Sequence, residues 1–135
     1  MNNLQELSNR LASYEFGGHQ FNCLTIEGEY NVLRVEVSDL EEMPIFLTIT
    51  ETQIICISYL FNKDEIFEDK QSDLNQYLLE LNVPMPLSAF AVIDDYYAIF
   101  GALSCGSTLD SISDELVTLA ANSIDSLQAL EEFIK

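Results

Sequence analysis

The sequence predicts an α+β fold, with an antiparallel sheet of about five to six strands and helices at the N-terminus, in the middle and at the C-terminus. Four stretches carry apolar residues at helical spacing, and others alternate apolar and polar residues as half-buried strands do. The predicted order is helix, four strands, helix, two strands, two helices. We expect one domain over residues 1–135, because this length suits one ordinary domain and not two.

The first element is predicted as a helix over Asn2–Tyr14. Asn3 is expected to cap it, with Glu6 three residues later completing a capping box. Gly17-Gly18 ends the element. The apolar stripe of this helix has four members: Leu4, Leu7, Leu11 and Tyr14.

A hairpin follows over Gln20–Val37, with its turn at Gly28-Glu29. Leu24 and Ile26 share one face of the first strand, and the apolar residues of the second strand are Leu33, Val35 and Val37. The opposite, wetter face is expected to carry Cys23, Thr25, Arg34 and Glu36. We expect Arg34, which lies in mid-strand, to pair with a neighbouring carboxylate.

A second hairpin is predicted over Pro44–Phe61, with its turn at Glu51-Thr52. The length of the loop decides which residues share a face, since a shift of one residue reverses every side chain. A two-residue loop mixes the apolar residues between faces. We favour an odd-length loop, although the turn lacks glycine, because it places six apolar residues on one face: Ile45, Leu47, Ile49, Ile55, Ile57 and Tyr59.

A middle helix is predicted within Asp64–Asn82, while Ile66 and Phe67 belong either to this helix or to the loop before it. Its apolar face comprises Leu74, Tyr77, Leu78 and Leu81. Two helices are predicted in the tail. The first begins at a capping box of Ser107 and Asp110, and Asn122-Ser123 separates it from the second.

The hairpin over Pro84–Ser104 is the central element of the predicted fold. A two-residue turn at Asp94-Asp95 pairs Ile93 with Tyr96, Phe90 with Ile99, and Ala89 with Phe100. Both faces of this hairpin are apolar, so we expect the rest of the chain to cover both. The alternative is that one face is exposed for a partner or a second subunit.

The chain is strongly acidic, with 5 Lys and Arg against 23 Asp and Glu, a net charge of −18 and a pI of about 4.1. Such a field repels phosphate backbones and anionic membrane surfaces and attracts basic partners. Nucleic acid is therefore not an expected partner. The six adjacent acidic pairs are interpreted as solvated: Glu41-Glu42, Asp64-Glu65, Glu68-Asp69, Asp94-Asp95, Asp114-Glu115 and Glu131-Glu132.

The sequence predicts a cytoplasmic protein without a membrane span. No apolar run approaches 18 residues, and Met1–Glu6 has neither the basic nor the apolar region of a signal peptide. The three cysteines, Cys23, Cys56 and Cys105, are odd in number and distant in sequence, which favours reduced thiols packed as small apolar groups. Cys56 is expected to be buried and inert.

No residue is predicted to be catalytic, to ligate a metal or to bind a cofactor. His19 is the lone histidine and is interpreted as a surface residue, since no partner lies at zinc-like spacing. Gly101–Gly106 has the spacing of a phosphate loop, but Ser107 occupies the position of the required lysine. We therefore interpret Gly101 as a point of close approach and Gly106 as a turn before a helix.

Several residues of the central hairpin form a recognisable motif: Pro86-Leu87-Ser88, Phe90, Tyr96-Tyr97 and Phe100-Gly101-Ala102-Leu103-Ser104. The motif resembles the signature of the YjfI family, small uncharacterised bacterial proteins. This resemblance implies an accessory role in envelope stress, because the family's genes tend to lie beside those of phage-shock protein A-like proteins. The order of elements is also similar to the type III secretion chaperone-like fold, whose members hold extended partner segments and often form dimers.

The leading functional prediction is a non-enzymatic, acidic, chaperone-like or accessory module that binds a partner protein. The resemblance implies a phage-shock protein A-like membrane-stress protein as that partner and leaves a homodimer open. One alternative is a small-molecule-binding protein or enzyme with a pocket between sheet and helices. Another is a structural subunit without a ligand of its own.

Overall fold

A computed structural model describes residues 3–135 and contains one antiparallel sheet of seven strands in the order β1-β2-β3-β4-β5-β7-β6. The predicted α+β class is confirmed, with one strand more than expected. The elements are α1 (Leu4–Ala12), β1 (Glu15–Phe16), β2 (His19–Ile26), β3 (Val32–Val37), β4 (Ile45–Ile49), β5 (Gln53–Asn62), η1 (Lys63–Glu65), η2 (Glu68–Lys70), α2 (Gln71–Leu81), β6 (Ala89–Ile93), β7 (Tyr96–Ser104), α3 (Leu109–Ala129) and η3 (Glu131–Phe133).

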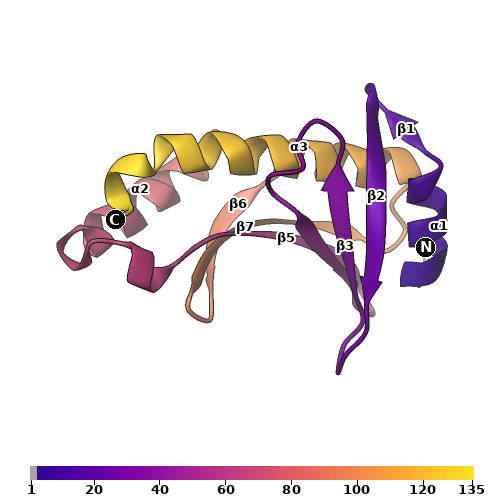
Figure 1. Cartoon of the computed structure of the whole chain (residues 1–135), viewed down its shortest axis with the longest axis horizontal. Helices are drawn as coiled ribbons and strands as arrows, with labels where there is room; N and C mark the ends of the chain where they lie inside the picture. The colour runs from indigo at the N-terminus through magenta and orange to yellow at the C-terminus, as the bar shows by residue number, and fades with distance from the viewer. Residues whose placement is uncertain (1–2) are drawn as a thin grey trace.

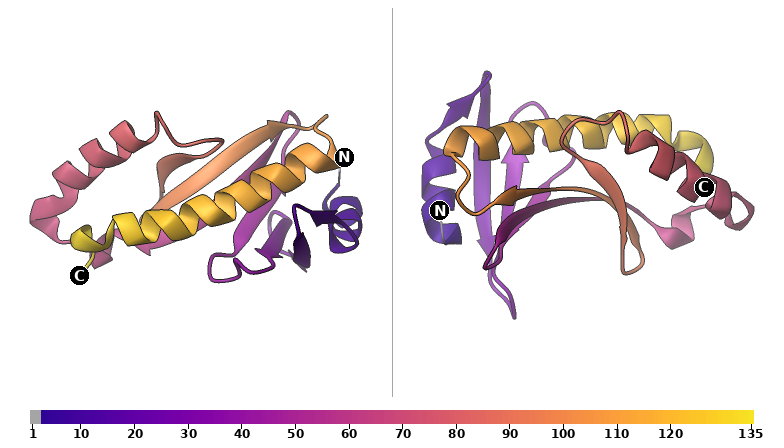
Figure 2. Two further views of the ribbon diagram at one scale, coloured as in Figure 1. Left: turned by 90° about the horizontal axis from the view of Figure 1, so that it is seen from above. Right: turned by 180° about the vertical axis from the view of Figure 1, so that it is seen from behind.

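The sheet forms an arch, and α3 runs along its convex side (Figure 1). In the view from above, α3 crosses the sheet and α2 lies beside its C-terminal half (Figure 2). The β2–β3 and β6–β7 hairpins extend downward in Figure 1, away from α3. None of the helices in residues 3–135 is long and apolar enough to cross a membrane.

The main core lies between the sheet and α3, and α1 closes one end of it. Ile112, Leu116 and Leu119 of α3 are fully buried together with Leu7 and Leu11 of α1. A second cluster joins α2, the end of α3 and the ends of β5 and β7. Its buried members are Phe61, Ile66, Leu74, Leu78, Tyr97, Leu130 and Phe133.

The start of the chain follows the prediction in part. The side chain of Asn3 caps α1 by accepting a 2.7 Å hydrogen bond from the Glu6 amide, whereas Asn2 lies outside the described residues. The helix ends at Ala12, before the predicted Tyr14. Gly17 and Gly18 adopt positive φ angles of 58° and 83° and turn the chain from β1 into β2. The short strand β1, which was not predicted, lies between the helix and these glycines.

The predicted break in the C-terminal helix is wrong, because α3 is continuous over 21 residues. The Asn122 side chain donates hydrogen bonds to the Pro86 carbonyl and the Ser88 hydroxyl, so it does not cap a new helix. The Ser123 hydroxyl donates to the Leu119 carbonyl one turn earlier, which leaves the helix intact. The predicted cap is also one residue early, since the Thr108 hydroxyl accepts from the Ser111 amide.

The predicted odd-length loop between β4 and β5 is wrong as well. Ile49 pairs with Ile54, and the Thr50 amide donates to the Gln53 carbonyl at 2.8 Å, so two residues form the loop. The Thr50 hydroxyl stabilises this turn by accepting from the amides of Thr52 and Gln53. Ile45 and Leu47 therefore lie on the opposite face from three residues that we grouped with them: Ile55, Ile57 and Tyr59.

The faces of the first hairpin also differ from the prediction. Cys23 pairs with Val35, and Thr25 pairs with Leu33. Cys23 and Thr25 therefore lie on the core side, whereas Leu24 pairs with Arg34 on the other side. The expected ion pair of Arg34 is confirmed, with Glu36 at 2.5 Å.

The central hairpin has the predicted register and the predicted turn at Asp94-Asp95. The middle helix α2 buries Leu74 and Leu78 as predicted, while Ile66 and Phe67 lie in the loop before it. The expectation that both faces of the central hairpin are covered is wrong, because α3 and α2 lie on one face and Figure 1 shows none of the described helices over the second.

Phe90 and Phe100 lie on opposite faces of the β6–β7 hairpin, so we expect them to contribute differently to the stability of the fold. Phe90 is half-buried and packs against both core clusters, whereas Phe100 belongs to neither. We expect Phe90→Ala to lower the free energy of unfolding by roughly 2–3 kcal/mol, below the range for a fully buried Phe, and Phe100→Ala by about 1 kcal/mol or less. Urea unfolding of both variants measures the difference, and equal losses would contradict this account of the two faces.

Candidate functional site

The strand register divides the side chains of the sheet between two faces. One row of paired residues lies on the side away from α3. It crosses six adjacent strands in the order β2, β3, β4, β5, β7 and β6. Its members are Leu24, Arg34, Phe46, Ile57, Phe100 and Ala89. A matching row on the α3 side comprises Thr25, Leu33, Leu47, Cys56 and Gly101.

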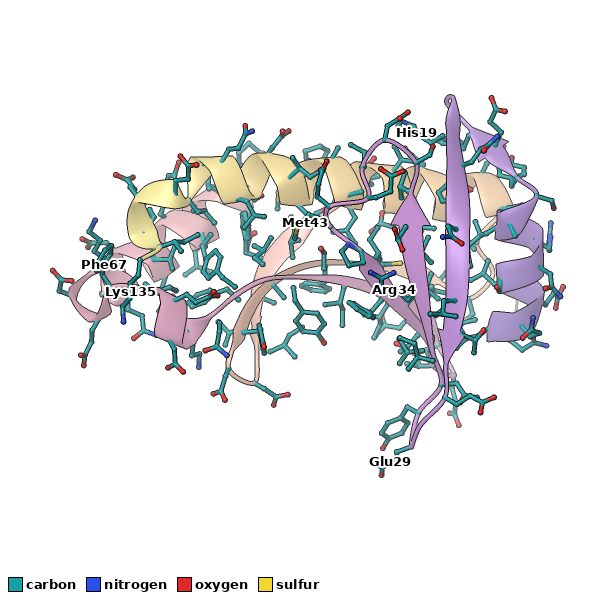
Figure 3. All side chains as sticks on the ribbon, in the orientation of Figure 1. His19, Glu29, Arg34, Met43, Phe67 and Lys135 are labelled. Carbon is teal, nitrogen blue, oxygen red and sulfur yellow. The ribbon has the colours of Figure 1, made fainter. Side chains whose placement is uncertain are left out.

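We call the surface away from α3 the open face. Figure 3 shows side chains that project from β5 and β7 into the space beneath the arch. Leu24 is 61% exposed, Tyr96 43% and Tyr59 38%. The apolar residues that define the open face are Leu24, Ile26, Val32, Phe46, Ile55, Ile57, Tyr59, Ile93, Tyr96 and Phe100.

Three aromatic rings cross the open face from β4 to β7. The ring centroids of Phe46 and Tyr59 lie 5.8 Å apart, and those of Tyr59 and Tyr96 lie 5.6 Å apart in an edge-to-face arrangement. Such contacts hold the rings in defined positions while one side of each remains in solvent. The cluster is a preformed apolar surface on strands that are paired on both sides.

The open face carries one ion pair on β3 and further charges at its borders. The Arg34–Glu36 pair is half-buried on β3 and balances its own charge. The two hairpin turns at opposite edges are acidic and exposed, with Glu27 and Glu29 after β2 and Asp94-Asp95 after β6. Figure 3 shows Glu29 at the tip of its hairpin, on the side away from α3. We call these four carboxylates the acidic tips.

Glu115 of α3 is an exception to the prediction that the adjacent acidic pairs are solvated. It is 3% exposed, and its Oε1 forms no hydrogen bond with another described residue. Its carboxyl fills the space above Gly101, where a Cβ atom would lie 1.6 Å from Oε1. This contact confirms the prediction of a close approach at Gly101. Burial, with a smaller contribution from Asp114, raises the pKa of Glu115 to about 7.

The thiols are placed largely as predicted. Cys56 is fully buried, and burial together with the nearby Glu115 carboxylate raises its pKa. Cys23 is half-buried, and burial raises its pKa to about 11 although a hydrogen bond with Ser8 opposes the shift. The Cys105 thiol donates to the Thr50 carbonyl at 3.4 Å. None of the three lies on the open face.

The structure brings no set of metal-ligand side chains together. Within residues 3–135, no three His, Cys, Asp or Glu side chains form a group that could hold a metal ion. His19 is half-buried at the start of β2, and its Nδ1 donates to the Ser38 carbonyl at 2.9 Å. Gly101 lies within β7 and Gly106 in the turn after it, so they do not form a phosphate-binding loop.

The alternative of a ligand pocket between sheet and helices concerns small hollows next to α2. One of about 200 Å³ lies between α2 and the β6–β7 hairpin, and one of about 250 Å³ lies between the end of α2 and the C-terminal half of α3. A larger hollow lies elsewhere. It has a volume of about 920 Å³ and lies between the start of α1, the β2–β3 turn and the end of β4. Its lining includes Asn3, Thr25, Glu27, Tyr30 and Thr48, with no cation and no thiol among the lining residues. The hollow is open to solvent and lies at the edge of the sheet.

The open face was missed because the sequence does not show what lies above each strand. The signal was present in β4 and β5, where apolar residues occupy both alternating positions. Such strands are usual in sheets that are buried on both faces. An apolar strand with only one layer of helices available therefore indicates an interaction surface.

Comparison with known proteins identifies relatives over most of the chain. The family model described as "Uncharacterized protein conserved in bacteria (DUF2170)" matches residues 1–134. The protein is 27% identical over 114 residues to "Uncharacterized protein YjfI" of Escherichia coli (strain K12), and equally to that of Escherichia coli O157:H7. These matches cover 82% of this chain and 84% of each relative, which confirms the resemblance to the YjfI family.

A chain in the crystal structure of the ExsC-ExsE complex is similar in overall arrangement. The TM-score is 0.45 at 10% identity, over 95% of this chain and 96% of that chain. These values are too low to transfer a partner from that complex to this protein.

The buried carboxyl of Glu115 predicts a specific dependence of stability on pH. Because its folded pKa lies above the ordinary value of 4.5, folding favours the protonated form. Its contribution to stability is complete below about pH 4.5 and is lost as the pH rises through 7. A shift of this size corresponds to a loss on the order of 3 kcal/mol.

Glu115→Gln keeps the shape of the side chain and removes its titration. We expect the stability of this variant to rise relative to the wild type as the pH increases from 4.5 to 8, as measured by urea unfolding. Asp125→Asn, an exposed carboxylate on the same helix, is the control, and its difference from the wild type is expected to stay constant. A Glu115→Gln difference that is also constant over this range would contradict the assignment.

Proposed function

This chain belongs to the bacterial family described as DUF2170, and on that premise we propose that it is a non-enzymatic module that binds a partner protein through its open face. The open face is the observation that carries the proposal. It is a contiguous apolar surface on the side of the sheet opposite to α3. Exposed apolar surfaces of this kind mark interaction sites in soluble proteins.

The composition of the open face supports a protein as the ligand. Its centre holds Tyr59, Tyr96 and Phe46, and aromatic residues are enriched in the energetically dominant parts of protein interfaces. Apart from the Arg34–Glu36 pair on β3, its charges lie at the acidic tips, toward the border, as charges do in such interfaces. The strands beneath it are paired on both sides, so binding requires no reorganisation of the sheet.

The placement of the perturbed groups supports a binding role over catalysis. Glu115 and Cys56 have raised pKa values, and strongly shifted groups are the usual candidates for catalysis. Both side chains are buried between α3 and the sheet, however, where a substrate has no access. The open face itself offers hydroxyl groups and apolar carbon, with Arg34 already paired.

Three finer statements form part of the proposal. Residues 1–135 act as one domain, which is supported by a core that α1, α3 and the sheet share. The protein works in the reducing environment of the cytoplasm, which suits the free thiols of Cys23 and Cys56. A phage-shock protein A-like membrane-stress protein is the partner to test first, because the resemblance to the YjfI family implies that association.

A photocrosslinking amino acid in place of Tyr59 tests whether a partner covers the open face. We expect a crosslinked product with another polypeptide in the bacterial cells that produce this protein, because Tyr59 lies at the centre of the proposed interface. The product is detected on denaturing gels and identified by mass spectrometry. Its yield is expected to fall when Tyr96→Ser is added.

Phe67 provides the matched control position. It is aromatic and 40% exposed, close to the 38% of Tyr59, but it lies in the loop between η1 and η2. The same crosslinker at Phe67 is expected to give little product. Equal products at both positions, or none at Tyr59 in a folded variant, would refute the proposal.

A further inference from the structure

The hydrogen bonding of the sheet restricts what can bind to the open face. Strands β3, β4, β5 and β7 each have a neighbour on both sides, so their backbone groups are paired within the sheet. A segment that lies on this face gains no backbone hydrogen bond from it. Its own N–H and C=O groups would be buried without partners unless the segment pairs them internally.

An extended peptide does not meet this requirement, because it needs the edge of a sheet rather than a face. The edge at β6 is partly occupied, since the Phe90 amide donates to the Asn82 side chain at 2.6 Å. Two structures satisfy their own backbone groups: a helix, and the sheet of a second copy of this chain.

Charge decides between these two occupants. Each copy carries a net charge of −18, and face-to-face packing would bring the acidic tips of two copies toward one another. Like charges at an interface are strongly unfavourable, so a second copy is a poor occupant. The acidic tips lie at opposite borders of the open face, which favours a segment with positive charge at both ends.

We propose that the open face binds an amphipathic helix of a partner protein, with an apolar stripe in the middle and Lys or Arg residues at both ends. The stripe packs on the three rings of Phe46, Tyr59 and Tyr96. The basic ends lie against Glu27 and Glu29 on one side and Asp94 and Asp95 on the other. This inference rests on the proposed function and adds the chemistry of the partner.

Three designed peptides of about 18 residues, five turns of helix, test the inference. The first is helical, with a Leu and Phe stripe and Lys at both ends. The second has Glu in place of Lys, and the third rearranges the residues of the first into an alternating strand pattern. We expect the first to bind about tenfold more tightly than either of the others, as measured by fluorescence anisotropy at physiological salt.

Matched variants connect binding to the site. Tyr59→Ala is expected to weaken binding of the first peptide several-fold, and Phe67→Ala to leave it unchanged. Asp94→Asn with Asp95→Asn is expected to weaken it and to reduce its dependence on salt. Glu41→Gln with Glu42→Gln removes the same charge from the exposed β3–β4 loop and is expected to have a smaller effect.

Three results would overturn the inference. The first is equal binding of the helical and the strand peptide, and the second is equal weakening by the two charge variants. The third is sedimentation that shows a dimer whose formation Tyr59→Ala prevents, since a second copy would then be the occupant. A crosslinked partner at Tyr59 together with any of these results would retain the proposed function and reject the amphipathic basic helix.

Discussion

The packing of a single helix against one face of the sheet determines the rest of this structure. At about 1.5 Å per residue, the 21 residues of α3 extend about 31 Å, and Ile112, Leu116 and Leu119 bury the central strands from one side only. α1 and α2 cover the two ends of the same side. Residues 3–135 contain no further α-helix for the other face, although the strands β4, β5 and β7 carry large apolar side chains there. The open face follows from this imbalance between apolar strands and available helices.

The contact between α3 and the sheet also includes one group whose burial is unfavourable when it is charged. Glu115 places a carboxyl above Gly101 in a space that an apolar side chain would fill without a charge. Burial raises its pKa to about 7, so the charged form is unfavourable in the folded protein. A Cβ at position 101 would overlap the Glu115 carboxyl as it lies here, so glycine leaves the room that this carboxyl occupies. The covered face thus contains one buried carboxyl within an otherwise apolar core, whereas the open face carries exposed aromatic rings.

Local patterns predicted most of the elements and one complete register, but not β1 or the continuity of α3. The Asn3 cap and the turn at Asp94-Asp95 are set by neighbouring residues and could be read from the sequence. The predictions failed where distant contacts or side-chain hydrogen bonds decide. Asn122 leaves α3 unbroken because it bonds to Pro86 and Ser88, and the Thr50 hydroxyl selects the two-residue loop that reverses the faces of β5. The open face could not be predicted, because alternation shows that two faces are apolar but not what lies above them.

Hydroxyl-radical footprinting of the isolated protein tests the central claim most directly, because neighbouring residues report the two faces. Tyr96 lies on the open face and is 43% exposed, while Tyr97 lies on the core side and is 1% exposed. The account predicts rapid modification of Tyr96 and Tyr59 and strong protection of Tyr97 over a wide range of protein concentration. Protection of Tyr96 and Tyr59 equal to that of Tyr97 would show that the face is covered in the protein alone, and would contradict the account.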